Sequence, residues 1–308
     1  MRTLSAWLLV VVAGLAPAAA QVQVDRSRPA AKAGTVSISN PFGSVKVIAW
    51  DKAEVAVTGR LAAGAEGLDL DGDKERVDVS VSVPEAWFYG SGQDLDYRSD
   101  LEVRVPASSA VDVETVNASI TIAGVSGPLE ISTVGGEVGV SGSPREVRVN
   151  GMTGAVTLDT ASSEVQVETV NGPVTIRGAT RSVSVRTVSG RVEVVGSGLT
   201  QVEVDSTAGD VRLEVGFAKQ GEVRVETFSG SVELVLPAAV AARFELQTFS
   251  GQITSDLGPK PRVQERRNPF QELRFATGSE EFETGVKTYS GNIVLRTGEP
   301  AKPVRPSQ

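Results

Sequence analysis

Acidic and basic side chains recur at a nearly constant spacing in the middle of this 308-residue sequence, and they could support carbohydrate chemistry. One such column contains Glu168, Arg186 and Asp205. Polysaccharide lyases and glycoside hydrolases use carboxylates, and in glycosidases the two carboxylates converge across about 5–9.5 Å. Stacked chain turns would instead place these charges one above another, about 4.8 Å apart, as an ion-pair ladder. We favour the ladder for this column and for a second one with Glu203, Arg224 and Glu245.

The sequence contains no histidine and no cysteine. This composition excludes a Ser-His-Asp triad, histidine general bases, histidine-ligated zinc, thiolate nucleophiles and disulfides. We therefore expect a protein that is not an enzyme and that needs no cofactor, with a carbohydrate-active enzyme as the alternative.

Three alternating acids, Asp69, Asp71 and Asp73, resemble a calcium-binding loop, in which oxygen ligands come from alternate positions. The EF-hand pattern requires a glycine directly after the third acid, and Lys74 occupies that place. We expect a solvated turn here and assign no metal site.

The segment from 85 to 97 gathers aromatic side chains in a chain that has only 5% aromatic residues. Such rings can stack on a sugar while neighbouring carboxylates accept hydrogen bonds from its hydroxyl groups. The alternative is that the aromatic side chains cover the open end of a stacked fold. The candidate ligand-binding residues are Trp87, Phe88, Tyr89, Asp94, Asp96 and Tyr97.

Residues 1–20 have the pattern of a signal peptide, with Arg2 before a short apolar run and small residues up to Ala20. Cleavage near Ala20/Gln21 would leave 29 Lys and Arg against 38 Asp and Glu, a net charge of −9. An acidic protein is repelled by nucleic acids and anionic membranes. We expect a secreted or periplasmic protein with no transmembrane segment in the mature chain and no nucleic-acid partner.

A repeated phrase shows how the charges are positioned. It consists of alternating apolar residues, a threonine, an apolar residue, a small residue and a glycine, followed by more alternating apolar residues. The phrase recurs at intervals of 18 residues between Gly136 and Gly190 and at 19–21 residues up to Gly251, with a last copy at Gly291. The alternation predicts two short strands per phrase, each with one buried face. A fixed period of this length is typical of a solenoid.

Two arrangements fit strand, turn and strand. The Asn171–Gly172 pair favours antiparallel hairpins. Most copies of the phrase carry a threonine at the same position. This favours parallel stacking, because the threonine hydroxyl groups could form hydrogen bonds along the stack. A left-handed hexapeptide helix is rejected, since the aliphatic residue that it requires every six positions is absent. We predict an all-β, right-handed, β-helix-like solenoid with turns of about 18–21 residues.

The interruptions of the period give the predicted organisation. We expect the solenoid to be capped at both ends, because an open end would expose unpaired strand edges. The aromatic residues Phe228, Phe249 and Tyr289 share one slot and are expected to form an internal stack. The predicted units are a signal peptide (1–20), an N-terminal cap with the first strands (21–110), regular repeats (111–256), an insertion with the last repeat (257–298) and a disordered tail (299–308).

The strand "DLEVRVP" at 100–106, the phrase "VxVxTxxGxVxV" at 183–194 and the closing "VKTYSGNIVL" resemble the bacterial putative-adhesin domain of unknown function. The resemblance covers roughly residues 35–297 and implies a β-helix-like fold and an envelope location. We expect a binding or structural module of the cell envelope whose partner is a polysaccharide or another envelope protein. An assembly or signalling scaffold is a further alternative.

Overall fold

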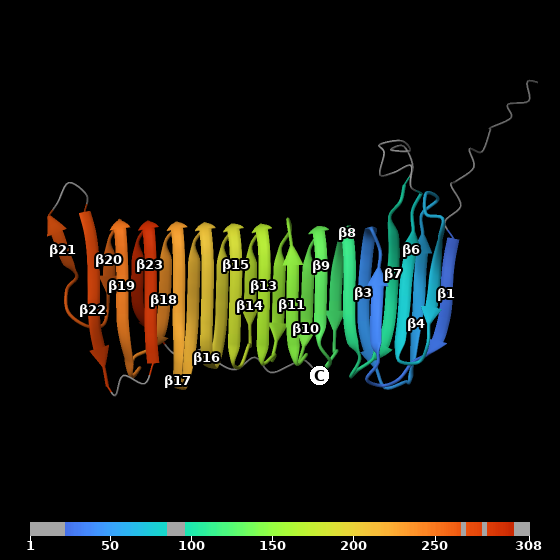
Figure 1. Cartoon of the computed structure of the whole chain (residues 1–308), viewed down its shortest axis with the longest axis horizontal. Coiled ribbons are helices and arrows are strands. Elements are labelled where there is room, and N and C mark those ends of the chain that lie inside the picture. Colours follow the sequence, from blue (N-terminus) through green and yellow to red (C-terminus); the bar gives the residue numbers. More distant parts are fainter. Residues whose placement is uncertain (1–21, 85–95, 266–268, 279–281, 299–308) are drawn as a thin grey trace, which may run out of the picture.

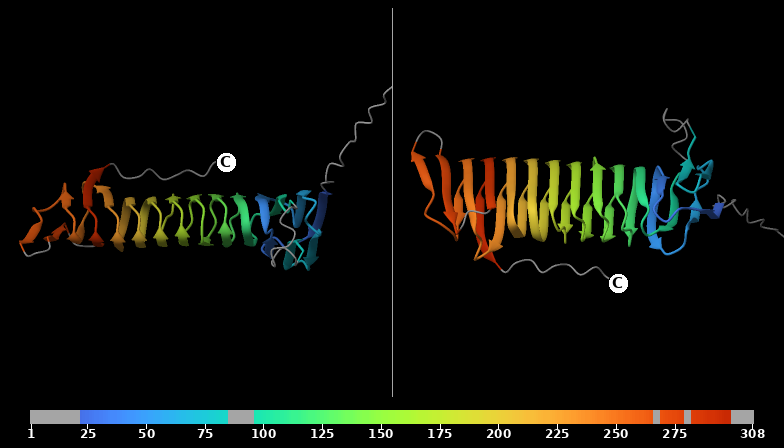
Figure 2. Two further views of the ribbon diagram at one scale, coloured as in Figure 1. Left: turned by 90° about the horizontal axis from the view of Figure 1, so that it is seen from above. Right: turned by 60° about the horizontal axis from the view of Figure 1, so that its bottom comes forward.

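The computed structural model describes residues 22–84, 96–265, 269–278 and 282–298. These residues form a long rod in which β-strands run across the axis and successive turns follow one another along it (Figures 1 and 2). Across the described ranges, all regular elements are β-strands, and no helix suited to crossing a membrane is found. The fold is therefore all-β and β-solenoid-like.

The middle of the rod consists of turns that each supply one strand to each of two sheets. Each of the longest strands passes through both sheets. The strands are β8 (Ala110–Ala123), β9 (Leu129–Gly135), β10 (Val138–Gly142), β11 (Glu146–Gly151), β12 (Val156–Thr160), β13 (Glu164–Asn171), β14 (Val174–Arg177), β15 (Ser182–Ser189), β16 (Val192–Ala208), β17 (Val211–Ser229) and β18 (Val232–Pro237).

Each strand pairs in parallel with its copies in the neighbouring turns. Val165 lies opposite Val147 on one side and Val183 on the other, so the register equals the 18-residue sequence period. The strands of one phrase, β13 and β14, pair with different neighbours instead of with each other. The hairpin arrangement is therefore wrong for these turns and parallel stacking is confirmed. The right-handed sense stays a prediction.

Aliphatic side chains from the two sheets fill the interior. In one turn Val165, Val167, Val174 and Ile176 are buried, and the positions between them face outward. Each such side chain contributes about 1.5–3 kcal/mol on burial, whereas ordering the backbone costs about 1–2 kcal/mol per residue. A turn is therefore stable only when neighbouring turns cover it and complete its hydrogen bonds.

At the N-terminal end, antiparallel pairs join the parallel stack. β2 and β3 stack in parallel on β8, and β6 and β7 stack in parallel on their outer side. β4 then pairs antiparallel with β7 and β1, and β5 with β6. The strands are β1 (Val22–Pro29), β2 (Thr35–Ser39), β3 (Phe42–Trp50), β4 (Glu54–Leu61), β5 (Gly67–Gly72), β6 (Arg76–Ser82) and β7 (Ser99–Pro106).

At the C-terminal end the chain returns into its own stack. β23 lies between β17 and β19, and β24 lies between β18 and β20, so the last turn along the chain is not the last along the rod (Figure 1). β22 pairs antiparallel with β19 and β21. The strands are β19 (Ala242–Ser250), β20 (Ile253–Ser255), β21 (Arg262–Glu265), β22 (Pro269–Thr277), β23 (Phe282–Ser290) and β24 (Ile293–Gly298).

Stacked glycines form the corner between the two sheets. Gly172 has a φ of +142°, which side-chain-bearing residues rarely adopt. A Cβ atom on it would lie 2.0 Å from the carbonyl oxygen of Gly154 in the previous turn. Gly190 repeats this arrangement on Gly172. The turns approach so closely at this corner that only glycine fits.

Replacing Gly172 by alanine should therefore destabilise the fold by about 3 kcal/mol, because the added methyl group meets fixed backbone at an unfavourable φ. Gly139→Ala is the matched control, since its Cβ would approach only the oxygen of Ile120, at 3.9 Å. Urea unfolding followed by far-UV circular dichroism measures both variants. Equal stability of the two variants would contradict the close corner.

Candidate binding groove

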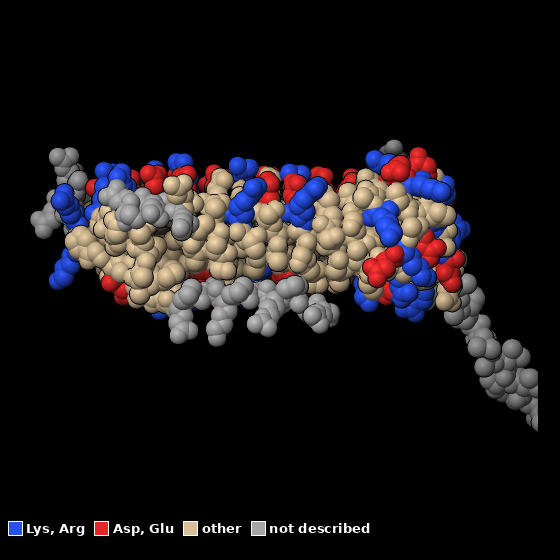
Figure 3. Space-filling model, turned by 90° about the horizontal axis from the view of Figure 1, so that it is seen from below, with Lys and Arg blue, Asp and Glu red and all other residues tan. Residues whose placement is uncertain are grey.

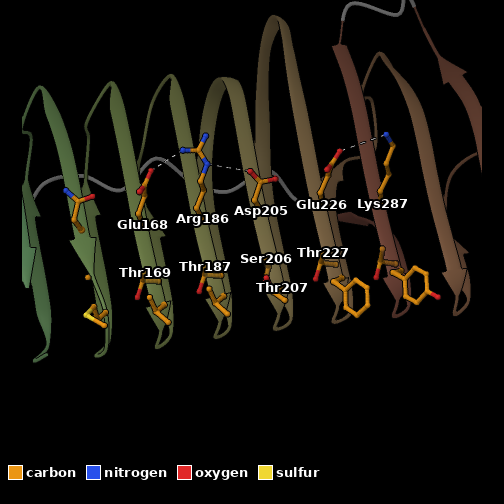
Figure 4. A pocket seen from close by; sticks show the side chains of 18 of the residues that line it. Glu168, Thr169, Arg186, Thr187, Asp205, Ser206, Thr207, Glu226, Thr227 and Lys287 are labelled. Carbon is orange, nitrogen blue, oxygen red and sulfur yellow. Dashed lines mark hydrogen bonds and ion pairs between the residues drawn. The ribbon is translucent and has the colours of Figure 1, made fainter. Parts of the chain in front are cut away.

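A groove with a volume of about 1110 Å³ follows the rod along the corner where each threonine-containing strand ends. Three rows of side chains line it, and most turns contribute one member to each row (Figure 4). In the turn of β15, for example, Arg186 belongs to a charged row, Thr187 to a hydroxyl row and Val188 to an apolar row. Because the turns stack in strict register, a short repeated motif produces three rows along the rod.

The apolar row is exposed to solvent. Val134, Met152, Val170 and Val188 have 44–52% of their surface exposed, whereas the valines of the interior have almost none. Seen from below, the middle of the rod presents a broad band with few charged side chains, and Lys, Arg, Asp and Glu gather along one rim, from which some basic side chains extend over the band (Figure 3). An exposed apolar surface of this extent, bordered by polar groups, is typical of an interaction site.

Aromatic side chains continue the apolar row toward the C-terminal end. The rings of Phe228 and Tyr289 lie 4.9 Å apart and nearly parallel, and Tyr289 and Phe249 lie 4.8 Å apart. The shared slot and the stack are confirmed, but the expectation of an internal stack is wrong. Phe228 is 58% exposed and Tyr289 is 49% exposed, because each follows a buried threonine and the alternation of the strand places it outside.

The hydroxyl row lies between the other two rows and is mostly buried. Thr115 donates to Thr133 along the stack at 2.8 Å, and Thr133 donates to the carbonyl oxygen of Gly135. The hydroxyl oxygens of Thr187, Ser206 and Thr227 have no hydrogen-bond partner among the described residues. A column bonded throughout along the stack was expected, and the structure corrects this, since only part of the row is bonded.

The charged row forms the predicted ion-pair ladder. Arg186 lies 3.0 Å from an oxygen of Glu168 on one side and 3.7 Å from an oxygen of Asp205 on the other (Figure 4). Glu226 and Lys287 continue the ladder with a 4.0 Å pair. All five side chains are partly exposed, so each pair contributes at most about 1 kcal/mol.

The second charge column was expected to be continuous, and the structure shows that it is interrupted. Glu203 stacks on Arg224, but Gly285 of the inserted strand β23 separates Arg224 from Glu245. The missing side chain leaves a depression of about 280 Å³ beside Arg224. Chain order therefore failed to predict spatial order at this end.

The three acids that resembled a calcium loop lie in a β-hairpin. Asp69 and Asp71 belong to β5, and Asp73 accepts hydrogen bonds from the backbone N–H groups of Glu75 and Arg76 in the turn to β6. These bonds, that from Arg76 first, lower the pKa of Asp73. In the part of the chain that the structure describes, no three such side chains converge on a metal position.

Most of the aromatic loop proposed from the sequence cannot be placed. Trp87, Phe88, Tyr89 and Asp94 lie outside the described residues. Asp96 is exposed and pairs with Arg98 at 3.3 Å. Tyr97 is only 8% exposed and its ring lies 6.4 Å from that of Phe42, so its faces are not offered to a sugar at the surface.

The exposed apolar row was missed at the sequence level, although its signal is present. The residue after each threonine is apolar in most copies, and it immediately precedes the corner pair such as Asn171–Gly172. Continued alternation after Thr169 would place Val170 outside, which is where it lies. Strict alternation, followed one residue further, would have identified the row.

One carboxyl group outside the groove has a raised pKa. Asp112 lies on the outer face of β8, where partial burial raises its pKa, and the nearby Glu114 and Glu130 raise it further. The opposite case is Glu102, whose pKa is lowered by its hydrogen bonds from Arg104 and Lys46. Folding therefore disfavours the ionised form of Asp112 and favours that of Glu102.

Replacing Asp112 by asparagine should raise the Tm by roughly 1–2 °C at pH 7. Native Asp112 takes up its proton at a higher pH than in the unfolded chain, so its penalty fades as the pH falls through the native pKa. The gain of the variant should shrink toward pH 4, as measured by thermal melts. Glu102→Gln, the control with the opposite shift, should lower the Tm at pH 7. A loss of stability in Asp112→Asn at pH 7 would contradict the assigned shift.

Comparisons with known proteins give structural and family matches. A putative adhesin from Bacteroides fragilis aligns at 12% identity and a TM-score of 0.40, over 92% of this chain and 100% of that chain. A putative cell adhesion protein from Clostridium sporogenes aligns at 7% identity and 0.26, over 90% and 100%. A putative lipid binding protein from Parabacteroides distasonis aligns at 12% identity and 0.34, over 88% and 96%.

No curated protein sequence matches this chain. A family model does match, over residues 35–296, the span that carries the repeated strands and the groove. This match confirms the family resemblance of the strand and turn motifs. The protein belongs to the Toastrack DUF4097 family.

Proposed function

We propose that the protein is a non-catalytic binding module of the cell envelope, and that its groove holds an elongated polymer. The observation that carries this proposal is the exposed apolar row, which contributes nothing to the buried core. Val134, Val170 and Val188 occupy equivalent positions of stacked turns, and each is about half exposed to solvent. Because the row is straight and repeats with each turn, it matches a ligand that is itself extended and repetitive.

The charged row supports binding without catalysis. A glycosidase needs two carboxylates that converge on its substrate. In the groove the candidates for such a pair are Glu168 and Asp205, which lie on either side of Arg186. Arg186 occupies the space between them, whereas in a glycosidase the substrate passes between the carboxylates. We therefore propose that these groups orient a ligand, and we expect no release of reducing sugar from any polymer that binds.

The envelope location rests on the signal-like residues 1–20, which lie outside the described residues, and on the family resemblance. An exported protein meets polysaccharide and envelope proteins as its abundant partners. A net negative charge disfavours nucleic acid and anionic lipid surfaces. Adhesion between cells would be one use of such a module.

The test is co-sedimentation of residues 21–308 with peptidoglycan, outer-membrane and polysaccharide fractions. The double variant Val170→Asp/Val188→Asp places two charges in the apolar row and should reduce saturable binding at least tenfold. Its Tm should stay close to that of the parent, because both side chains are already exposed.

The matched control is Val22→Asp, since Val22 is 57% exposed but does not line the groove. A Trp87→Ala/Tyr89→Ala variant tests the aromatic loop in the same assay. Loss of binding only in the loop variant would move the site away from the groove. Binding to none of the fractions would reject the proposed function.

A further inference from the structure

One ring of the apolar row, Phe228, has a face against which no other aromatic ring of the described residues stacks. Tyr289 lies between Phe228 and Phe249, so both of its faces are occupied. On the other side of Phe228 the next member of the row is Thr207, the one small polar residue in a series of valine, methionine and aromatic side chains. A phenyl ring extends further from the backbone than threonine does. Its outer part therefore remains open, in agreement with its 58% exposure.

Hydrogen-bonding groups surround this open face. Asp205 precedes Thr207 by two residues, and Glu226 precedes Phe228 by two, so both carboxylates lie in the charged row beside the ring (Figure 4). Arg186 and Asp205 form an ion pair at 3.7 Å, too long for a hydrogen bond, so the carboxylate keeps its acceptor capacity. Between the ring and the carboxylates lie Ser206 and Thr227, whose hydroxyl oxygens have no partner among the described residues.

We propose that this slot, formed by Asp205, Ser206, Thr207, Glu226 and Phe228, is a subsite for one sugar unit of a neutral polysaccharide. This proposal rests on the proposed function and names its ligand class. A pyranose ring has an apolar face of C–H groups, which can pack on the open face of Phe228, and a rim of hydroxyl groups. Those hydroxyl groups donate to the two carboxylates, which are acceptors only.

The carboxylates of the slot disfavour two other kinds of ligand with a flat apolar face. An aromatic side chain of a protein partner offers at most one hydrogen-bond donor, which leaves carboxylate oxygens desolvated without a partner. Acidic sugars would approach Asp205 and Glu226 with like charge. The rod is straight (Figure 2), so the groove that runs along it favours an extended chain over a coiled one. The best match is a neutral, β-linked sugar chain that continues along Val188 and Val170.

The test is titration calorimetry of residues 21–308 with cellohexaose and chitohexaose, which are extended and neutral. Maltohexaose is the coiled comparison and hexagalacturonate the acidic one. We expect at least one extended neutral oligosaccharide to bind at least tenfold more tightly than the two comparison sugars. Phe228→Leu keeps an apolar side chain but removes the ring, and it should weaken this binding at least tenfold.

A second variant tests the open face without removing the ring. Thr207→Phe continues the stack and covers Phe228, so it should abolish sugar binding while the protein stays folded. The control Phe275→Leu removes a ring that is stacked on Phe244 and does not line the groove, and it should change affinity less than about twofold. Thermal melts of all three variants exclude unfolding as the cause.

Different results separate the subsite from the groove. Unchanged sugar affinity in Phe228→Leu and Thr207→Phe would overturn the subsite. No binding of either extended neutral sugar would also overturn it. The groove proposal would still stand in both cases if Val170→Asp/Val188→Asp loses its capture of an envelope fraction. If that variant captures the fraction as the parent does, the groove and the subsite are both rejected.

Discussion

Backbone contact at the glycine corner is the constraint on which the rest of the structure depends. The turns approach one another so closely that a Cβ at Gly154, Gly172, Gly190 or Gly209 would lie within about 2 Å of the carbonyl oxygen of the preceding glycine. This contact fixes the register of each turn on the next. Because the register is strict, equivalent residues of successive turns form straight rows, and both the core and the groove follow from those rows.

Toward the C-terminal end of the rod, strands that are distant in the sequence join the regular stack. The last turn along the chain, β23 and β24, is held between the turns of β17–β18 and β19–β20, with parallel neighbours on both sides. The inserted turn also completes the aromatic stack, because Tyr289 comes to lie between Phe228 and Phe249. The aromatic stack is thus assembled by pairing between strands that are distant in the sequence, and it ends at the face of Phe228 that is directed toward Thr207.

Much of the fold could be predicted because its information is local and periodic. The 18-residue spacing predicted parallel stacking and the ladder of Glu168, Arg186 and Asp205, since copies in adjacent turns must lie side by side. The insertion of β23 could not be predicted, because nothing near Gly285 indicates which strands it separates. Which hydroxyl groups of the hydroxyl row form hydrogen bonds depends on small differences in geometry, and these cannot be predicted from residue types. The groove itself was missed because the exposed position after each threonine was interpreted as part of the interior.

In the proposed function, the outward rows form the binding surface, while the inward rows only hold the rod together. Methyl-selective NMR tests this most directly, with solubilised envelope polysaccharide added to the labelled protein. The account predicts that the methyl signals of Val134, Met152, Val170 and Val188 shift together, while those of the buried Val149, Val167 and Val185 stay in place. Shifts absent from the exposed row, or confined to the ends of the rod, would contradict it.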